Sequence, residues 1–242
     1  MNELALFAGA GGGILGGHLL GWKTVCAVEI EDYPRRVLLA RQRDGILPRF
    51  PIWDDIRTFD GKPWKGRVDV VSGGFPCKGI SPARTNSDVN GKQGWIGGTE
   101  LWGEMFRIIG EVKPQFVLVE NSQNLRTKGL ALVLQDLDRM GYNTARCKLG
   151  CRQFGADHIR NRMWIVANSD GAQRQGGRVS SRIHQKHTNI VSTDWWESEP
   201  EMERVAHGMA NWVDRLKAIG NGQVPAVVRL AWNTLTRGEN NE

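Results

Sequence analysis

Three segments of the chain place side chains that could take part in covalent catalysis beside apolar runs. Cys77 ends the small-residue turn Ser72-Gly-Gly-Phe-Pro-Cys77, Glu120 follows a hydrophobic run, and Arg160 and Arg162 precede another. A thiol can act as a nucleophile, a carboxyl group can donate a proton, and guanidinium groups can hold an anion or a carbonyl oxygen. These residues indicate a nucleophile with an acid and a substrate-holding group, so a cofactor pocket is the remaining requirement.

Cys77 is interpreted as the nucleophile because of where its turn lies. The run 68–71 indicates a strand, and a turn after it would leave the thiol at the carboxyl edge of a sheet, where open α/β sheets bind ligands. The alternative is a buried cysteine that packs as a small hydrophobic residue. Glu120 would lie at the same edge after the strand 115–119, where poor solvation raises a carboxyl pKa and favours a proton donor at neutral pH.

Arg160 and Arg162 are two residues apart, so in an extended segment their side chains point the same way. Two guanidinium groups aimed at one place suit a phosphate or a base carbonyl group. Salt bridges at the start of a strand explain the same spacing equally well, and the spacing alone leaves both open.

A cofactor pocket is indicated at the start of the chain. We expect a buried strand at 4–8 and then the glycine-rich turn 9–17, which leads into a helix. Glycines at that junction let a ligand approach the backbone at a helix N-terminus. Gly11, Gly13 and Gly16 also satisfy G-x-G-x-x-G, which keeps a dinucleotide-binding oxidoreductase open.

Acidic residues stand at the ends of the next two predicted strands. The strand 23–28 ends at Glu29, where a carboxylate can accept hydrogen bonds from both hydroxyl groups of a ribose. A short strand over 52–56 would end at Asp55 and Ile56. This pair suits an adenine, because the acid can take the exocyclic amine and the aliphatic side chain can cover the ring. The alternative for Glu29 is a solvated carboxylate at a strand end.

Length and composition favour one main domain with a small appendage. The chain has 242 residues, of which 40% are hydrophobic, so it can bury one sizeable core. Its net charge of +6 favours a polyanionic partner.

No apolar stretch approaches the roughly 18 residues of a membrane span. The amino terminus also lacks a leader pattern, so we expect a cytoplasmic protein with no membrane partner.

The cysteines indicate a reducing compartment. All four lack the spacing of a disulfide framework, and a thiol nucleophile would survive where disulfides do not form. Cys147, Cys151 and His158 suggest metal ligation, but a fourth ligand is missing, so we expect no metal. No pattern indicates an obligate protein partner.

Helix and strand patterns alternate along the chain, and two polar segments interrupt them. Helical patterns cover 33–43, 101–112 and 130–140, and strand patterns cover 142–149 and 163–167. Residues 78–98 are polar and glycine-rich, and loops of this length are usually lids or binding loops. From 168 to about 193 the chain is rich in Gly, Ser, Gln, Asn and Arg, so we expect this segment to order on contact with nucleic acid. A helix with Pro225 in its first turn follows.

Taken in order, these motifs resemble those of the DNA cytosine-5 methyltransferase family. Phe7-Ala-Gly-Ala-Gly-Gly12 resembles the family's cofactor loop F-x-G-x-G-G, Glu29 its ribose-binding acid, and Asp55-Ile56 its adenine-binding pair. Gly74-Phe-Pro-Cys77 resembles its nucleophile motif, and Glu120-Asn121 the start of its E-N-V motif. Arg160-Asn-Arg162 resembles the end of Q-x-R-x-R, and Gly220-Asn-Gly222 the G-N motif that closes the cofactor site. The match runs through most of the chain.

The resemblance implies an α/β, Rossmann-like fold of the S-adenosylmethionine-dependent methyltransferases: a mostly parallel twisted sheet with helices on both faces, and a small, irregular target-recognition segment. The implied units are a catalytic and cofactor-binding domain (1–167), a reduced target-recognition segment (168–212), a C-terminal segment that returns to the catalytic domain (213–238) and a tail (239–242).

The resemblance also assigns site residues. The catalytic residues are Cys77, Glu120, Arg160 and Arg162. The residues for S-adenosylmethionine are Phe7, Ala8, Gly9, Gly11, Gly12, Glu29, Ile30, Asp55, Ile56, Pro76, Leu101 and Asn221. The partner is double-stranded DNA, with contacts from Lys78, Arg84, Lys92, Arg174, Arg178 and Arg182. The last three could read guanine or only neutralise phosphates.

The family's chemistry implies a covalent mechanism on a cytosine extruded from the duplex. The Cys77 thiolate would add to C6 while protonated Glu120 supports N3, and C5 would then take the methyl group before losing its proton. Arg162 could lower the thiol pKa and hold the cytosine O2. Residues 78–98 could close over the pocket, with their basic residues on phosphates.

Departures from the family pattern are local, with one exception. His158 stands for Gln, Ser122 for Val, and Gly222 where Ser or Ala is frequent. The stretch between Arg162 and the closing segment is shorter than the family's usual target-recognition region, as in phage and prophage forms. Two alternative functions remain open for a chain with these motifs. One is a tRNA cytosine-5 methyltransferase, and the other is an inactive DNA-binding relative. An NAD-dependent oxidoreductase is weaker, because hydride transfer has no use for the Pro-Cys turn.

Overall fold

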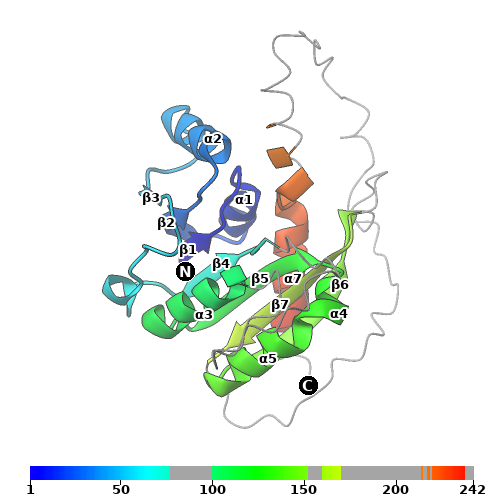
Figure 1. Cartoon of the computed structure of the whole chain (residues 1–242). Helices are drawn as coiled ribbons and strands as arrows, with labels where there is room; N and C mark the ends of the chain where they lie inside the picture. Colours follow the sequence, from blue (N-terminus) through cyan, green and yellow to red (C-terminus); the bar gives the residue numbers. More distant parts are fainter. Residues whose placement is uncertain (77–99, 152–159, 170–213, 215–216, 219, 238–242) are drawn as a thin grey trace, which may run out of the picture.

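One mixed sheet organises the molecule (Figure 1). The computed structural model describes residues 1–76, 100–151, 160–169, 214, 217, 218 and 220–237. Its strands are β1 (Asn2–Leu6), β2 (Lys23–Val28), β3 (Ile52–Trp53), β4 (Val70–Gly73), β5 (Phe116–Ser122), β6 (Asn143–Leu149) and β7 (Arg162–Asn168). Its helices are α1 (Gly12–His18), α2 (Asp32–Arg43), α3 (Glu100–Val112), α4 (Leu125–Lys128), α5 (Leu130–Arg139) and α7 (Pro225–Arg237), with a 3-10 turn η1 (Lys62–Trp64).

The strand order is β3-β2-β1-β4-β5-β7-β6. Neighbouring strands from β3 to β5 are parallel, whereas β7 is antiparallel to both β5 and β6. The expected α/β fold with a mostly parallel sheet is therefore confirmed. Because β7 runs the other way, its first residues lie at the edge where β1, β4 and β5 end.

Alternating side chains give the sheet two apolar faces. Leu4, Leu6 and Val71 belong to the core that α3 and α5 cover, whereas Ala5 and Val70 belong to the cores beneath α1, α2 and α7. Successive strand residues point to opposite faces, so a sheet buried on both sides requires the nearly continuous apolar runs seen in the sequence.

The last helix packs against the first. Trp232 of α7 meets Trp22 edge-to-face with ring centroids 4.7 Å apart, and it meets Phe116 of β5 at 5.2 Å. A Cβ atom on Gly16 of α1 would overlap Val228 of α7, so only glycine permits this approach. The two ends of the described chain thereby close one face of the sheet.

Of the seven predicted strands, 23–28 keeps its bounds in the structure as β2, and the other six differ. The physical reason is clear for three of them. β1 ends at Leu6 because Phe7 adopts a positive φ of 51°. β3 has two residues, since Asp55 forms a turn in which its carboxylate and carbonyl accept bonds from Arg57 and Thr58. β5 extends to Ser122 because β7 pairs with it along its whole length. Among the described helices, none has the length and apolarity that a bilayer crossing requires.

Candidate active site

Glu120 lies in β5 with its carboxyl group buried. The residue is 7% exposed, and its Oε1 atom is 2.9 Å from Nε of Arg162. Burial raises the pKa of this carboxyl group above its usual value, while Arg162, Arg160 and a hydrogen bond from Gln223 oppose that rise. The raised pKa agrees with the expectation for a carboxyl group near the end of a hydrophobic strand.

Strand pairing explains why Arg162 reaches Glu120. In the antiparallel ladder Glu120 lies opposite Trp164, so Arg162, two residues before Trp164, points to the same face of the sheet. Both side chains are mostly shielded from water, since the Arg162 side chain is 25% exposed and the Glu120 side chain is 9% exposed. A charge-assisted bond in such surroundings holds both groups in a defined orientation.

Asn121 points to the opposite face and holds the turn that leads to residue 77. Its Nδ2 atom donates to the carbonyl oxygen of Phe75 at 2.9 Å. The Phe75 ring is 2% exposed and packs on Trp102 of α3 with a centroid distance of 5.5 Å. Adjacent residues of β5 thus serve two purposes: Glu120 faces Arg162, and Asn121 fixes the turn that ends at Pro76.

Arg160 binds the C-terminal segment rather than Glu120 directly. Its guanidinium group donates to the carbonyl oxygen of Gly220 at 2.7 Å and to that of Gly222. The two arginines therefore face one region, as an extended segment requires, but they hold different partners. Arg160 fixes the G-N-G turn beside the acid.

Gln223 is a site residue that the sequence interpretation missed. Its amide donates to the Glu120 carboxylate, and its backbone lies against Gly12, where a Cβ atom would overlap the Gln223 carbonyl oxygen. The glycine at the first position of α1 is thus required by the close approach of the segment that contains Gln223. The signal available in the sequence was the position of Gln223 directly after Gly220-Asn-Gly222, next to predicted site residues.

A pocket lies at the carboxyl ends of β1 and β4. Phe7, Ala8 and Gly9 line one side, Gly73 and Gly74 another, and Glu120 and the segment 221–223 close it. A Cβ atom on Gly9 would meet nothing within 4 Å, so the backbone there faces open space. Of the predicted cofactor residues, Phe7, Ala8, Gly9 and Asn221 line this pocket.

Glu29 is attached to the glycine loop. Its Oε2 atom accepts the backbone N–H of Gly9 at 2.7 Å, and its Oε1 atom accepts that of Glu31 at 2.8 Å. Burial raises the pKa of the Glu29 carboxyl group, and these two backbone bonds oppose the rise. The acid therefore shapes the loop beside the pocket.

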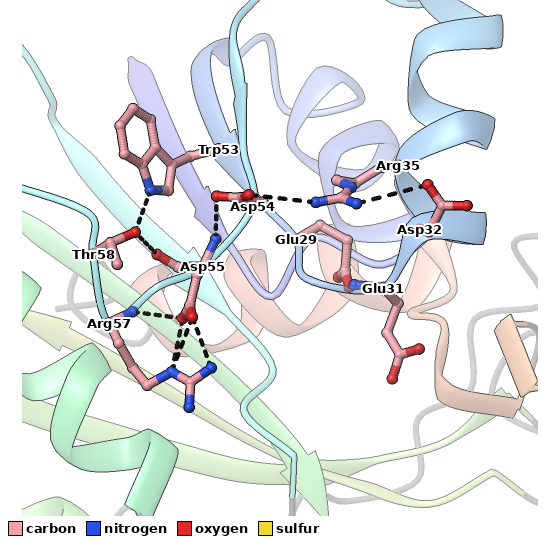
Figure 2. A network of polar contacts seen from close by, with 9 residues as sticks. All are labelled: Glu29, Glu31, Asp32, Arg35, Trp53, Asp54, Asp55, Arg57 and Thr58. Carbon is pink, nitrogen blue, oxygen red and sulfur yellow. Dashed lines mark hydrogen bonds and ion pairs between the residues drawn. The ribbon is translucent and has the colours of Figure 1, made fainter.

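Asp55 is engaged by a neighbouring arginine (Figure 2). Its carboxylate faces the Arg57 guanidinium group, with Oδ2 at 2.7 Å from Nη2, and the pKa of Asp55 is lowered by these hydrogen bonds. The Ile56 side chain is 5% exposed and belongs to the core under α3. The Asp55 carboxylate is thus already paired with Arg57, and the Ile56 side chain packs in the core.

Arg107 of α3 ties the segment after β3 to the helix. Its Nη2 and Nη1 atoms donate to the carbonyl oxygens of Ile56 and Phe59 at 2.8 and 3.1 Å. Glu111 accepts from Arg107 at 2.8 Å and also accepts the backbone N–H of Gly61 at 2.8 Å. These bonds fix the segment 55–61 that contains the predicted adenine pair.

The other predicted cofactor residues described by the structure are not among those that line this pocket. Gly11 has a φ of 92° at the N-cap of α1, and Gly12 begins the helix. Leu101 packs against the core in α3, whereas Ile30 is 55% exposed. Pro76 is exposed at the end of the turn after β4.

Several predicted residues fall outside the described ranges. These are Cys77 and His158, together with the DNA contacts Lys78, Arg84, Lys92, Arg174, Arg178 and Arg182. Their predicted roles stay predictions. In the part of the chain that the structure describes, no group of three or more His, Cys, Asp or Glu side chains could hold a metal ion.

Comparison with known proteins places the chain beside DNA methyltransferases. The type II methyltransferase M.CviJI of Paramecium bursaria Chlorella virus IL3A is 28% identical over 98% of this chain and 60% of its own length. The type II methyltransferase M.PspPI of a Psychrobacter species is 36% identical over 57% of this chain and 32% of its own length. The chain therefore spans less than two thirds of these curated relatives.

Solved structures support the same fold. A DNA modification methyltransferase encoded within an E. coli prophage matches 69% of this chain and 46% of its own, with a TM-score of 0.53 and 23% identity. The Dnmt2 methyltransferase of S. pombe matches 72% of this chain and 53% of its own, with a TM-score of 0.57 and 19% identity. The model of the C-5 cytosine-specific DNA methylase family matches residues 1–228. The chain belongs to the C-5 cytosine-specific DNA methylase family.

Proposed function

We propose that the chain is a DNA cytosine-5 methyltransferase, which transfers a methyl group from S-adenosylmethionine to C5 of a flipped-out cytosine through a covalent bond between Cys77 and C6. The observation that carries this proposal is the pairing of Glu120 with Arg162 beside the turn that leads into Cys77. A buried acid, an oriented cation and a nucleophile turn at one sheet edge suit the activation of a pyrimidine ring.

The residues in and near the pocket are of the types that S-adenosylmethionine requires. The backbone at Gly9 is open to a ligand, and Asn221 also lines the pocket. Glu29, fixed by Gly9, is the proposed partner of the ribose hydroxyl groups, and the segment at Asp55 and Ile56 is the proposed adenine site. When bound, S-adenosylmethionine supplies an electrophilic methyl group. The proposal involves no metal ion.

The protein's own residues would divide the remaining work. The Cys77 thiolate adds to C6, which makes C5 nucleophilic, and protonated Glu120 donates a hydrogen bond to N3 so that negative charge moves into the ring. Arg162 orients Glu120 and can hold the cytosine O2. Transfer of the methyl group would leave S-adenosylhomocysteine, and loss of the C5 proton to water with departure of the thiolate would then regenerate the enzyme.

DNA binding is assigned to basic residues beyond the pocket. Lys78, Arg84 and Lys92 would contact phosphates, and the segment 168–212 would supply target recognition through Arg174, Arg178 and Arg182. The net charge of +6 supports a polyanionic partner. Flipping the base costs a few kcal/mol, which these contacts must offset.

Trapping on 5-fluorocytosine tests this proposal. The chain, S-adenosylmethionine and duplex DNA with 5-fluorocytosine at every cytosine are expected to give a covalent protein–DNA species in denaturing mass spectrometry, because fluorine cannot leave as a proton does. Cys77→Ser should give none, while Cys147→Ser, in β6, should give the wild-type amount.

Two further measurements identify the substrate and the methylated site. Bisulfite sequencing of plasmid DNA from cells expressing the chain should reveal methylated cytosines within one sequence context, and duplex DNA should exceed tRNA as methyl acceptor. Adduct formation by Cys77→Ser, or no adduct with the wild-type chain, would contradict the covalent mechanism. Methylation of tRNA alone would replace the proposed substrate.

A further inference from the structure

Gln223 lies where the glycine loop, the turn after β4 and the acid of β5 meet. A Cβ atom placed on Gly74 would be 2.7 Å from Oε2 of Glu120 and 3.0 Å from Nε2 of Gln223. A Cβ atom placed on Gly13 would be 2.5 Å from Oε1 of Gln223. The two ends of this amide therefore face different parts of the site: Nε2 faces the acid, and Oε1 faces the start of α1.

Arg160 fixes the backbone that carries this side chain. Its guanidinium group binds the carbonyl oxygens of Gly220 and Gly222, and Gly222 directly precedes Gln223. α7 begins two residues later at Pro225, and its contact with α1 sets the other end of the segment. Gln223 is therefore held by its neighbours on both sides.

The chemistry of an amide suits a carboxyl group that must carry a proton. Glu120 already faces two cations, since Arg162 is bonded to it and Arg160 lies near enough to affect its charge. A third cation would hold the acid in its ionised form. An amide carries no charge, and it has both donor and acceptor atoms, so it can bond either the carboxylate or the protonated acid.

This inference rests on the proposed function. We propose that Gln223 is a positioning residue, which orients the Glu120 carboxyl group and connects it to the glycine loop that lines the cofactor pocket. Gln223 acts through Glu120, which is the group assigned to the substrate ring.

Two substitutions at Gln223 separate orientation from general packing. Gln223→Met keeps the length of the side chain but removes the amide, and Gln223→Glu keeps its shape but places a second carboxyl group beside the first. In both variants the pKa of Glu120 should rise, and it should rise more in Gln223→Glu because like charges repel. The matched control is Gln135→Met, an exposed glutamine on α5.

The primary measurement needs neither cofactor nor DNA. A 13C NMR titration of the side-chain carboxyl groups, with the Glu120 signal assigned through Glu120→Gln, follows the protonation of Glu120 directly. We expect kcat to fall by about tenfold or more in Gln223→Met, with a smaller change in the KM for S-adenosylmethionine. The alkaline limb of the pH profile should move to higher pH, because Glu120 stays protonated longer.

The outcomes are distinct. An unchanged Glu120 titration in both variants, with normal kcat, would overturn the role of Gln223. Thermal unfolding by circular dichroism checks the fold, and Gln223→Glu, which alters the shape least, decides the matter if Gln223→Met is unstable. If the wild-type chain transfers no methyl group, the proposed function fails, while the NMR titration still shows whether Gln223 controls Glu120.

Discussion

Glu3 places a carboxyl group in the middle of the sheet. It is fully buried in β1 and accepts hydrogen bonds from Thr24 of β2 at 2.7 Å and from Ser72 of β4 at 2.6 Å. Burial raises the pKa of Glu3 to about 7, although both hydroxyl groups oppose the rise. Since Ser72 also lines the pocket, this acid joins three strands directly beside the proposed cofactor site.

Glu3 should make the stability of the protein depend on pH. The folded chain binds this proton more tightly than the unfolded chain, so its contribution is complete at acidic pH and is lost as pH rises from about 4.5 through 7. The loss is on the order of 3 kcal/mol. Urea unfolding of the wild type and Glu3→Gln at pH 5 and pH 8 measures this change in the free energy of unfolding.

The comparison between the two chains isolates Glu3 from other buried acids. Glu3→Gln should lose less stability between pH 5 and pH 8 than the wild type. Asp138→Asn, an exposed carboxyl group on α5, is the control and should follow the wild type. Identical pH dependence in Glu3→Gln and the wild type would contradict the assignment.

At the scale of elements, α3 positions the segment after β3. Arg107 is 34% exposed and binds two carbonyl oxygens of that segment while Glu111 binds a backbone N–H. Polar groups of a turn that would otherwise move independently are thus bonded to a rigid helix. The proposed adenine site inherits its geometry from α3, although the two are separated by about fifty residues in the chain.

Removing this anchor should affect cofactor affinity more than the chemical step. In Arg107→Ala the segment 55–61 loses its two hydrogen bonds to the guanidinium group, so the Kd for S-adenosylhomocysteine, measured by calorimetry, should rise by about tenfold, or about 1.4 kcal/mol. Arg107→Lys should be intermediate, because an ammonium group cannot span both carbonyl oxygens. Arg139→Ala, on α5, is the control.

A change in kcat with an unaltered Kd for this ligand would mean that α3 supports the catalytic groups rather than the cofactor segment. Hydrogen exchange at residues 56–61 gives an independent measurement. These amides should exchange faster in Arg107→Ala if the bonds from α3 restrain the segment.

At the scale of the whole molecule, the packing of α7 on α1 joins the two ends of the described chain. Val228 occupies the space above Gly16, and Trp232 packs between Trp22 and Phe116. This contact places Asn221 and Gln223 beside the glycine loop. The pocket is therefore completed by residues more than two hundred positions from those of its first strand.

Gly16→Ala tests the closeness of this packing. The new methyl group would overlap Val228, which is β-branched and held on α7, and overpacking of this kind costs about 1–3 kcal/mol. The gain in helix propensity, about 1 kcal/mol at most, offsets only part of it. Thermal unfolding should show a lower Tm.

Gly110→Ala is the matched control, since Gly110 is also inside a helix. A Cβ atom there would approach only the flexible end of Met140, at 3.2 Å, so stability should be unchanged or improved. A Tm of Gly16→Ala that is as high as that of the wild type and Gly110→Ala would mean that α1 and α7 can move apart without cost.

The sequence alone determined the features that depend on local order. Apolar runs predicted the strands and their alternation between helices, because a sheet covered on both faces needs apolar residues along each strand. The glycine loop, Glu29 and Glu120 could be located for the same reason, since each directly follows or ends such a run. Bounds failed where a turn or a partner strand decided them, as at Asp55 and Ser122.

Tertiary structure decided which of these residues meet. Arg162 faces Glu120 because β7 inserts antiparallel beside β5, and spacing along the chain carries no information on strand order. Gln223 and Arg160 joined the site because α7 returns to pack on α1, a contact between distant segments that no local pattern encodes. Local sequence sets side-chain chemistry and where strands form, whereas long-range packing brings separate carboxyl, guanidinium and amide groups into one place.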